Sequence, residues 1–263
     1  YYSKGEDFYG GNLPSAAVTT LIVAFLLAMM GFADDFTKIR KKHNEGLTEI
    51  QKLICQFVLG IGFVLYLGIR NHWDTTIALP FTDYRLDLWY FYYLFAFICF
   101  VGFVNGTNIT DGIDGLLTSV TVPVNVLFMI FAVTDGASDM AVLNAAFLGG
   151  LIGFLFFNWN PARVFMGDTG SMFIGGMFVC TAFVLDVPYA LFIAGFVYLI
   201  ETFSVLIQRT YYKLSHGKRL FKMTPIHHGL ELDGWSEKKI VFTFTAISLI
   251  TCIICALGKY IRF

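Results

Sequence analysis

The chain has 263 residues, of which 57% are hydrophobic, 17% are aromatic and only 14% are charged. In soluble domains about a quarter of the residues are charged, so this composition excludes an ordinary soluble globular protein. The formal net charge of −1 is uninformative taken whole, because the charges are segregated along the chain. No nucleic-acid partner is expected.

Apolar runs divide the chain into membrane-spanning candidates. A spanning helix needs about 20 mostly apolar residues, and eight segments meet that requirement. They cover approximately residues 14–33, 50–69, 90–108, 117–134, 141–158, 171–187, 189–208 and 240–258. The sequence therefore predicts an all-α polytopic membrane protein with about eight transmembrane helices. Because no repeat or soluble segment interrupts the pattern, residues 1–263 are expected to form a single integral membrane domain.

The distribution of Lys and Arg predicts the orientation. If the first two helices are joined on the cytoplasmic side, 13 of the 18 basic residues fall in cytoplasmic loops, as the positive-inside rule requires. The same orientation places four polar clusters on the cytoplasmic face. They are Asp34-Asp35, residues 105–115, residues 165–171 and His227-His228. Their coincidence on one face predicts a single site.

The stretch from Asn105 to Gly115, NGTNITDGIDG, joins two of the predicted spans. Charged groups at membrane depth are costly and normally face a cavity, a partner or an ion. Oxygen-rich side chains suit Mg²⁺, and glycines let a ligand approach the backbone. Asp111 and Asp114 are three residues apart and would line one face of a helix. The stretch predicts a site that handles a metal ion and phosphate groups.

The sequence GFADDFTK contains two adjacent aspartates, Asp34 and Asp35. They could be a solvated helix end, but adjacent carboxylates repel one another unless a cation or a shared proton relieves them. On a continuing helix, Asp34 and Lys38 share a face because they are four residues apart, while Asp35 points elsewhere. We favour a functional pair.

The segment FMGDTGS, residues 165–171, opens the sixth predicted helix. Asp168 or Thr169 could act only as a helix N-cap, although a helix N-terminus also binds phosphate well. Phe165 could be a packing residue or a platform on which a nucleobase stacks. The residues alone leave both alternatives open.

Polar residues recur near the end of the chain. Glu201 lies within an apolar helix, with Gln208 seven residues later on the same face, and an intramembrane carboxylate is a functional candidate. A single loop histidine is usually only solvated, but His227 and His228 are adjacent and follow Pro225. Carboxylates, lysines, histidines and amides together are typical of phosphoryl transfer. Beside a bilayer, one reactant is expected to be a lipid phosphate.

These motifs resemble those of the polyprenyl-phosphate N-acetylhexosamine-1-phosphate transferase superfamily, and within it the phospho-N-acetylmuramoyl-pentapeptide transferase family. The similarity runs from about residue 31 to 239 in the family's order. The segments that carry it are GFADDFTK, NEGLT with Gln51-Lys52, NGTNITDGIDGL, FNWNPARVFMGDTGS, ETFSVLIQ and FKMTPIHHGLELDGWSE. The last segment discriminates best, because related sugar-phosphate transferases carry a different histidine motif.

The resemblance implies a reaction. Undecaprenyl phosphate attacks UDP-MurNAc-pentapeptide, UMP leaves, and lipid I is formed for peptidoglycan biosynthesis. It also implies a requirement for Mg²⁺, a homodimer, and a multi-pass protein of the bacterial plasma membrane with a cytoplasmic active site. The family has ten transmembrane helices, and the two that precede its DDxxK helix are expected to be missing from this chain.

The resemblance also implies roles for individual residues. Asp168 matches the metal-ligating aspartate. Asp34 and Asp35 match the pair proposed either to deprotonate the lipid phosphate or to act as nucleophile. Lys38 and Lys52 would hold phosphates. The positions that match the nucleoside pocket are Asn108, Asp111, Phe165 and Gln208, with Phe165 stacking on uracil. The further positions assigned to the active site are Asn105, Asp114, His227 and His228.

The chain departs from the family at one motif. The family usually has a third histidine followed by Phe, where this chain has Gly229 and Leu230, so no role is placed on a third histidine.

Two alternative functions are open. A polyprenyl-phosphate GlcNAc-1-phosphate transferase of the same superfamily is the nearest alternative. An ion-coupled transporter is a different class, which predicts inverted repeats and charges at the bilayer midplane. The choice between direct attack and a covalent phospho-enzyme is also open.

Overall fold

The computed structural model describes residues 15–41 and 46–261. Some of the sequence predictions fall outside these residues. They are the start of the first span at Pro14, Asn44 and Glu45 of the NEGLT match, and Lys4, Lys42 and Arg262 of the charge count.

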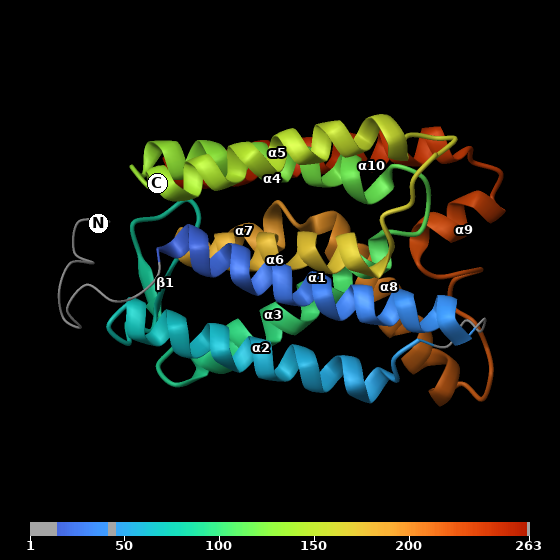
Figure 1. Cartoon of the computed structure of the whole chain (residues 1–263), viewed down its shortest axis with the longest axis horizontal. Coiled ribbons are helices and arrows are strands. Elements are labelled where there is room, and N and C mark those ends of the chain that lie inside the picture. The colour runs from blue at the N-terminus through green and yellow to red at the C-terminus, as the bar shows by residue number, and fades with distance from the viewer. Residues whose placement is uncertain (1–14, 42–45, 262–263) are drawn as a thin grey trace.

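The described residues form ten helices and one short hairpin (Figure 1). The helices are α1 Ala16–Lys41, α2 Glu49–Arg70, α3 Phe91–Thr110, α4 Leu116–Thr134, α5 Ser138–Asn158, α6 Gly167–Val184, α7 Tyr189–Ile193, α8 Phe196–Leu214, α9 Ile226–Leu232 and α10 Glu237–Tyr260. The strands β1 Thr76–Ala78 and β2 Arg85–Asp87 pair antiparallel. The predicted all-α architecture is confirmed.

Within the described residues, 7 helices are long and apolar enough to cross a membrane, which is one fewer than the sequence predicts. The difference lies in the predicted span 189–208, which the structure divides into α7 and α8 at Ala194 and Gly195. A side chain at Gly195 would meet the Leu191 carbonyl at 2.2 Å, so the chain is tightly folded at this break. The second part, α8, carries Glu201 and two basic residues and is less apolar than the spans.

Close packing of α1 on α6 brings two distant parts of the sequence together. A Cβ built on Gly176 would lie 2.9 Å from the Cα of Ala24. A Cβ on Gly31 would lie 2.2 Å from the carbonyl oxygen of Asp168. Small residues at these positions let the two backbones touch. The first turn of α6 therefore lies directly against the part of α1 that carries Asp34 and Asp35.

Buried aromatic rings fix the helices around this pair. The rings of Phe103 on α3 and Phe178 on α6 meet edge to face at 5.5 Å, and Phe178 meets Tyr198 on α8 at 5.3 Å. The Tyr198 hydroxyl lies 2.9 Å from the Thr121 hydroxyl on α4, so this buried ring also has a polar partner. Such pairs contribute about 0.5–1.5 kcal/mol each beyond their buried area. The framework behind the polar residues is thus apolar and tightly packed.

The two ends of the bundle differ in character. The β1–β2 hairpin lies at one end, and α9 lies at the other (Figure 1). At the hairpin end, Arg85 forms an ion pair with Asp186 at 2.6 Å, and Phe81 N–H donates to the Gly258 carbonyl. The sequence-predicted polar clusters are at the α9 end.

Two predicted local features are corrected at that end. Asp34 and Asp35 lie inside α1, because the helix continues to Lys41 rather than ending near residue 33. Asp111 and Asp114 do not share a helical face, because α3 ends at Thr110 and both lie in the turn before α4. Gly115 has a φ of 74° there, a conformation that glycine adopts without strain.

The contact between α1 and α6 yields a stability prediction. Gly176→Ala should lower the thermal unfolding temperature, because the added methyl group overlaps Ala24 and overpacking costs about 1–3 kcal/mol. Gly149→Ala on α5 is the matched control, since nothing lies within 4 Å of a Cβ at that position. Thermal unfolding of the purified variants in detergent tests this, and an equal effect of both substitutions would contradict the packing account.

Candidate active site

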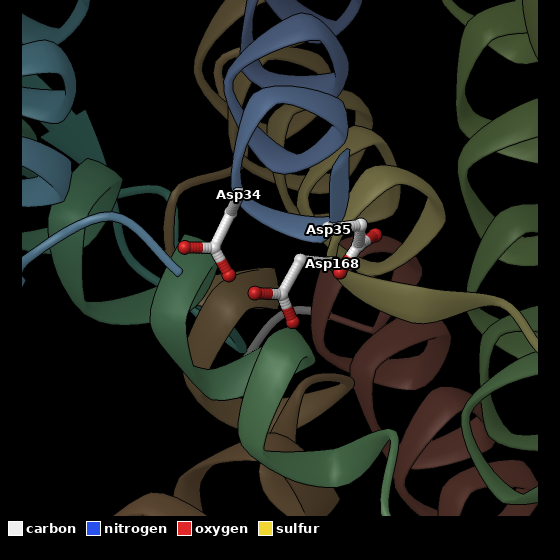
Figure 2. Close-up of side chains that lie close together, drawn as sticks. All are labelled: Asp34, Asp35 and Asp168. Atoms are coloured by element: carbon white, nitrogen blue, oxygen red, sulfur yellow. The ribbon is translucent and has the colours of Figure 1, made fainter. Parts of the chain in front are cut away.

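Three carboxylates from α1 and α6 converge at the α9 end of the bundle. One oxygen from each of Asp34, Asp35 and Asp168 lies within 4.8 Å of the others. Figure 2 shows that Asp34 and Asp35 extend from neighbouring positions on α1 to either side of Asp168. Asp34 is completely buried, whereas Asp35 is partly exposed. The close approach of Gly31 to the first turn of α6 places the three groups together.

Two lysines bridge this carboxylate cluster. Lys38 Nζ lies 2.6 Å from Asp34 Oδ2 and 2.9 Å from Asp168 Oδ2. Lys52 Nζ, from α2, lies 2.8 Å and 3.0 Å from the same two oxygens. Because burying an unpaired carboxylate is very costly, these contacts offset the cost of burying Asp34 inside the protein. Three carboxylates against two ammonium groups leave a surplus of one negative charge.

The other carboxylate oxygens have partners from separate segments. Asp34 Oδ1 accepts a hydrogen bond from Leu47 N–H at 2.6 Å. Asp35 Oδ2 accepts from both the N–H and the hydroxyl of Thr169, each at 3.1 Å. The N-cap alternative is therefore not supported for Thr169, because its side chain holds Asp35. The cap of α6 is Met166, without a side-chain hydrogen bond.

The two asparagines of α3 have different surroundings. Asn108 donates to Asp168 Oδ1 at 2.8 Å and to Ser171 Oγ at 2.9 Å, so it orients the Asp168 carboxylate. Asn105 pairs with Gln56 on α2 through reciprocal amide hydrogen bonds of 2.8 and 3.3 Å. Asn108 thus contacts the carboxylate cluster, whereas Asn105 faces α2; the nucleoside-pocket role implied for Asn108 stays a prediction. The substrate-binding role predicted for Asn105 gains no support from these contacts.

The two aspartates of the turn between α3 and α4, Asp111 and Asp114, also have different surroundings. Asp114 Oδ2 accepts hydrogen bonds from Ala162 N–H at 2.8 Å and Asn160 Nδ2 at 3.4 Å, so it anchors the loop before α6. Burial, together with the charges of Asp168 and Asp35, raises the pKa of Asp111 to about 7. Asp111 therefore belongs electrostatically to the cluster, while Asp114 supports the neighbouring loop.

That loop presents Phe165 to the outside. The residue is 75% exposed, so it does not pack into the core of the chain. A large exposed aromatic ring beside the first turn of α6 is free to stack on a planar ligand. The packing alternative is therefore not supported, and the stacking role predicted for Phe165 stays a prediction.

The histidine segment contacts the turn between α3 and α4, which carries Asp111. His227 is completely buried, and a Cβ on Gly112 would lie 2.1 Å from its Nε2. His228 is half-buried, and its Nδ1 lies 2.6 Å from Glu231 Oε2. The two imidazole rings are 4.2 Å apart. The structure thus brings the histidines to the same end as the carboxylates, as predicted.

Gln208 has a different neighbourhood from the one predicted. Its Oε1 accepts hydrogen bonds from Leu220 N–H and Phe221 N–H at 3.0 Å each, and its Nε2 donates to the Phe221 carbonyl at 3.2 Å. Both polar atoms of the amide are therefore engaged by the loop that precedes the histidines. In this structure Gln208 anchors that loop, and a direct contact with a nucleoside would require these bonds to open.

Sequence reasoning missed several supporting residues. The sequence suggests only an N-cap role for Thr169 and none for Ser171, although Thr169 holds Asp35 and Ser171 holds Asn108. Gln56 interrupts the apolar run 50–69, and this isolated polar residue was a usable signal for a buried partner such as Asn105. No local pattern indicates that Gly31 must lie against the Asp168 backbone.

The shifted pKa of Asp111 yields a prediction. The pKa is raised from the usual 3.8 to about 7, so the unfolded chain ionises first as the pH rises. Asp111 therefore destabilises the fold progressively between these values, and fully above them. We predict that Asp111→Asn unfolds at a higher temperature than wild type at about pH 8 and at the same temperature at about pH 4.

Thermal unfolding in detergent with a chelator checks this, because a bound cation would offset the effect. A less stable Asn variant at the higher pH would contradict the assigned surroundings of Asp111.

Comparison with known proteins identifies the family. The model of "Glycosyl transferase family 4" matches residues 17–186, which include the carboxylate cluster. The chain is 40% identical over 248 residues to the phospho-N-acetylmuramoyl-pentapeptide-transferase of Listeria monocytogenes, covering 94% of this chain and 76% of that protein. Proteins of the same name are 41% identical in Bacillus mycoides (95% and 76% covered) and 43% identical in Clostridium perfringens (93% and 75% covered). The chain therefore belongs to glycosyl transferase family 4.

Proposed function

We propose that this protein transfers phospho-MurNAc-pentapeptide from UDP-MurNAc-pentapeptide to undecaprenyl phosphate, which gives lipid I and UMP. The observation that carries the proposal is the pair of lysines bridging Asp34 and Asp168 at one end of a membrane helix bundle. Phosphoryl transfer depends mainly on positioning and on neutralising phosphate charge, and this cluster supplies both kinds of group. The names of the relatives support the donor and the product.

The carboxylate cluster fits a magnesium ion. Its donors are carboxylate oxygens that lie within 4.8 Å of one another, and Mg²⁺ prefers such hard oxygen ligands. The surplus negative charge that remains after the two lysines also favours a cation. Asp168 would hold the ion, with Asp34 and Asp35 beside it. When bound, Mg²⁺ would neutralise charge on the pyrophosphate.

The other steps of the reaction are assigned to individual residues of the chain. Lys38 and Lys52 provide ammonium groups that bind phosphate oxygens. Asn108 keeps Asp168 oriented through its 2.8 Å hydrogen bond. Asp35 is more accessible than the completely buried Asp34, so we assign Asp35 as the acceptor of the lipid phosphate's proton. This assignment favours direct attack by the lipid phosphate over a covalent phospho-enzyme.

The remaining substrate groups lie around the cluster. Phe165 would stack on the uracil ring, with Asp111 near the nucleoside. His227 and His228 would border the pyrophosphate. The basic residues support an orientation that places this end in the cytoplasm, because most of them lie in the loops at the same end. The protein would act as a single domain in the bacterial plasma membrane, as a homodimer.

The transporter alternative has less support. It predicts charged groups at mid-membrane, whereas Asp34 and Asp35 lie toward the end of α1 and Asp168 lies in the first turn of α6. These helix ends lie toward α9 (Figure 1). No specific contact favours a GlcNAc donor over a muramoyl donor, so the assay must separate the two.

Release of UMP tests the proposal. The purified protein is supplied with undecaprenyl phosphate and either UDP-MurNAc-pentapeptide or UDP-GlcNAc, with Mg²⁺ or with chelator. We expect release only from the muramoyl donor and only with the metal. Release from UDP-GlcNAc would move the protein to the related transferases, and release from neither donor would overturn the transferase proposal.

Loss of one cluster carboxylate should remove activity. Asp168→Asn retains the shape of the side chain but removes a charge that holds the metal, so turnover should fall by at least about a hundredfold. Asp135→Asn is a suitable control, because Asp135 pairs with Lys259 outside the cluster. Turnover of Asp168→Asn close to that of the control would disprove the metal role.

Loss of the exposed ring should weaken nucleotide binding. Phe165→Ala removes a stacking surface worth about 1–3 kcal/mol, so the affinity for UDP should fall roughly tenfold. The control is Phe156→Ala, which removes a ring that is 80% exposed on α5. Calorimetric titration of UDP compares the two, and an unchanged affinity in Phe165→Ala would exclude the stacking role.

A further inference from the structure

A buried carboxylate on α8 faces the beginning of α9. Glu201 is completely buried, and its Oε2 accepts a hydrogen bond from Ile226 N–H at 2.8 Å. Its Oε1 accepts from His227 N–H at 3.3 Å and lies 3.2 Å from His227 Nδ1. A buried carboxylate is costly unless its oxygens are satisfied. The hydrogen bonds therefore fix the beginning of α9 on α8 and place the ring of His227 against the carboxylate.

The imidazole of His227 lies between this carboxylate and the turn that carries Asp111. Its Nδ1 edge faces Glu201. On the opposite edge, a Cβ at Gly112 would lie 2.1 Å from Nε2 and 2.7 Å from Cε1. Only a glycine leaves room for the ring at this distance. The ring therefore connects Glu201 to the active-site turn, one residue from Asp111.

Both ring nitrogens of His227 are buried, and neither has a hydrogen-bond partner among the described residues. Nδ1 lies beside Glu201 Oε1, whereas Nε2 lies on the side of Gly112. An unsatisfied buried polar atom costs about 1–3 kcal/mol, and Nε2, packed against Gly112, would meet a group of the substrate when this turn moves. A carboxylate beside Nδ1 favours the proton on that nitrogen, because an unprotonated Nδ1 would face the oxygen with its lone pair. Glu201 would thus decide which nitrogen the substrate meets.

We propose that Glu201 is the positioning residue of His227: it holds the proton on Nδ1 and directs Nε2 toward the substrate near Gly112. The effect on turnover rests on the proposed function, whereas the proton position does not. Carboxylates that orient a functional histidine in this way typically change activity by about 10–100-fold when they are altered.

The substitution Glu201→Gln makes a specific prediction about this proton. The amide can accept a hydrogen bond only through its oxygen, and the short contact from Ile226 N–H favours the oxygen at the Oε2 position. The amide NH₂ then occupies the Oε1 position and donates to Nδ1. The proton of a neutral His227 should therefore move to Nε2, so that the ring presents a donor instead of an acceptor.

Nitrogen NMR of protein labelled with ¹⁵N-histidine measures the proton position directly. The chain has 5 histidines, and the His227 signal is identified by its loss in His227→Gln. We expect protonated Nδ1 in wild type and protonated Nε2 in Glu201→Gln. A wild-type His227 that carries its proton only on Nε2 would overturn the proposal, and this result needs no variant of Glu201 that folds.

Turnover supplies the second measurement. In the UMP-release assay, kcat of Glu201→Gln should fall by at least about tenfold, while KM for the nucleotide donor changes by less than about threefold. Ser204→Ala is the matched control, because its buried hydroxyl donates to the main-chain carbonyl of Glu201 and not to the carboxylate.

The outcomes separate the two proposals. Wild-type protein without UMP release would contradict the proposed function and leave the NMR result to decide the role of Glu201. Active wild type with an unchanged kcat and tautomer in Glu201→Gln would disprove the positioning role. Equal losses of kcat in Glu201→Gln and Ser204→Ala would show that Glu201 contributes only to packing, which would disprove the positioning role.

Discussion

The buried charge of Asp34 is the constraint on which the rest of the site depends. A carboxylate with no exposed surface requires compensating groups, and the chain supplies Lys38 from the next turn of α1 and Lys52 from α2. The same two ammonium groups contact Asp168, so the charge balance of α1 also fixes the first turn of α6. Three helices are therefore held in register by one cluster, and under the proposed function its lysines would neutralise phosphate charge.

Two outer layers keep this cluster in place. The first consists of neutral hydrogen-bond donors, Thr169 to Asp35 and Asn108 to Asp168, which orient the carboxylates without changing the charge balance. The second consists of loop anchors. Asp114 holds the loop that carries Phe165, and Gln208 holds the loop that precedes the histidines. Residues predicted to touch the substrate thus divide into those in the cluster and those that position its surroundings.

The sequence predicted the features that depend on local composition. Long apolar runs predict the spans, and the positions of the aspartates and the histidines on one face predict one site. The role of Lys52 in that site comes only from the family resemblance. Features that depend on contacts between distant segments were not predictable. The approach of Gly31 to Asp168 and the pairing of Asn105 with Gln56 arise only when α1, α2, α3 and α6 pack together. The separation of Asp111 from Asp114 depends on where α3 ends, and helix ends are the least certain part of a sequence-based prediction.

The most direct test of this account is a titration of the carboxylate cluster with Mn²⁺, which shares the preference of Mg²⁺ for oxygen ligands. Free Mn²⁺ is measured by electron paramagnetic resonance in wild type and in Lys52→Met, which removes one positive charge beside Asp34 and Asp168. If the lysines and the cation share this cluster, Lys52→Met should bind Mn²⁺ more tightly by roughly tenfold, because one unit of unfavourable charge is gone. Weaker or unchanged binding would contradict the assignment of the cluster as a cation site balanced by lysines.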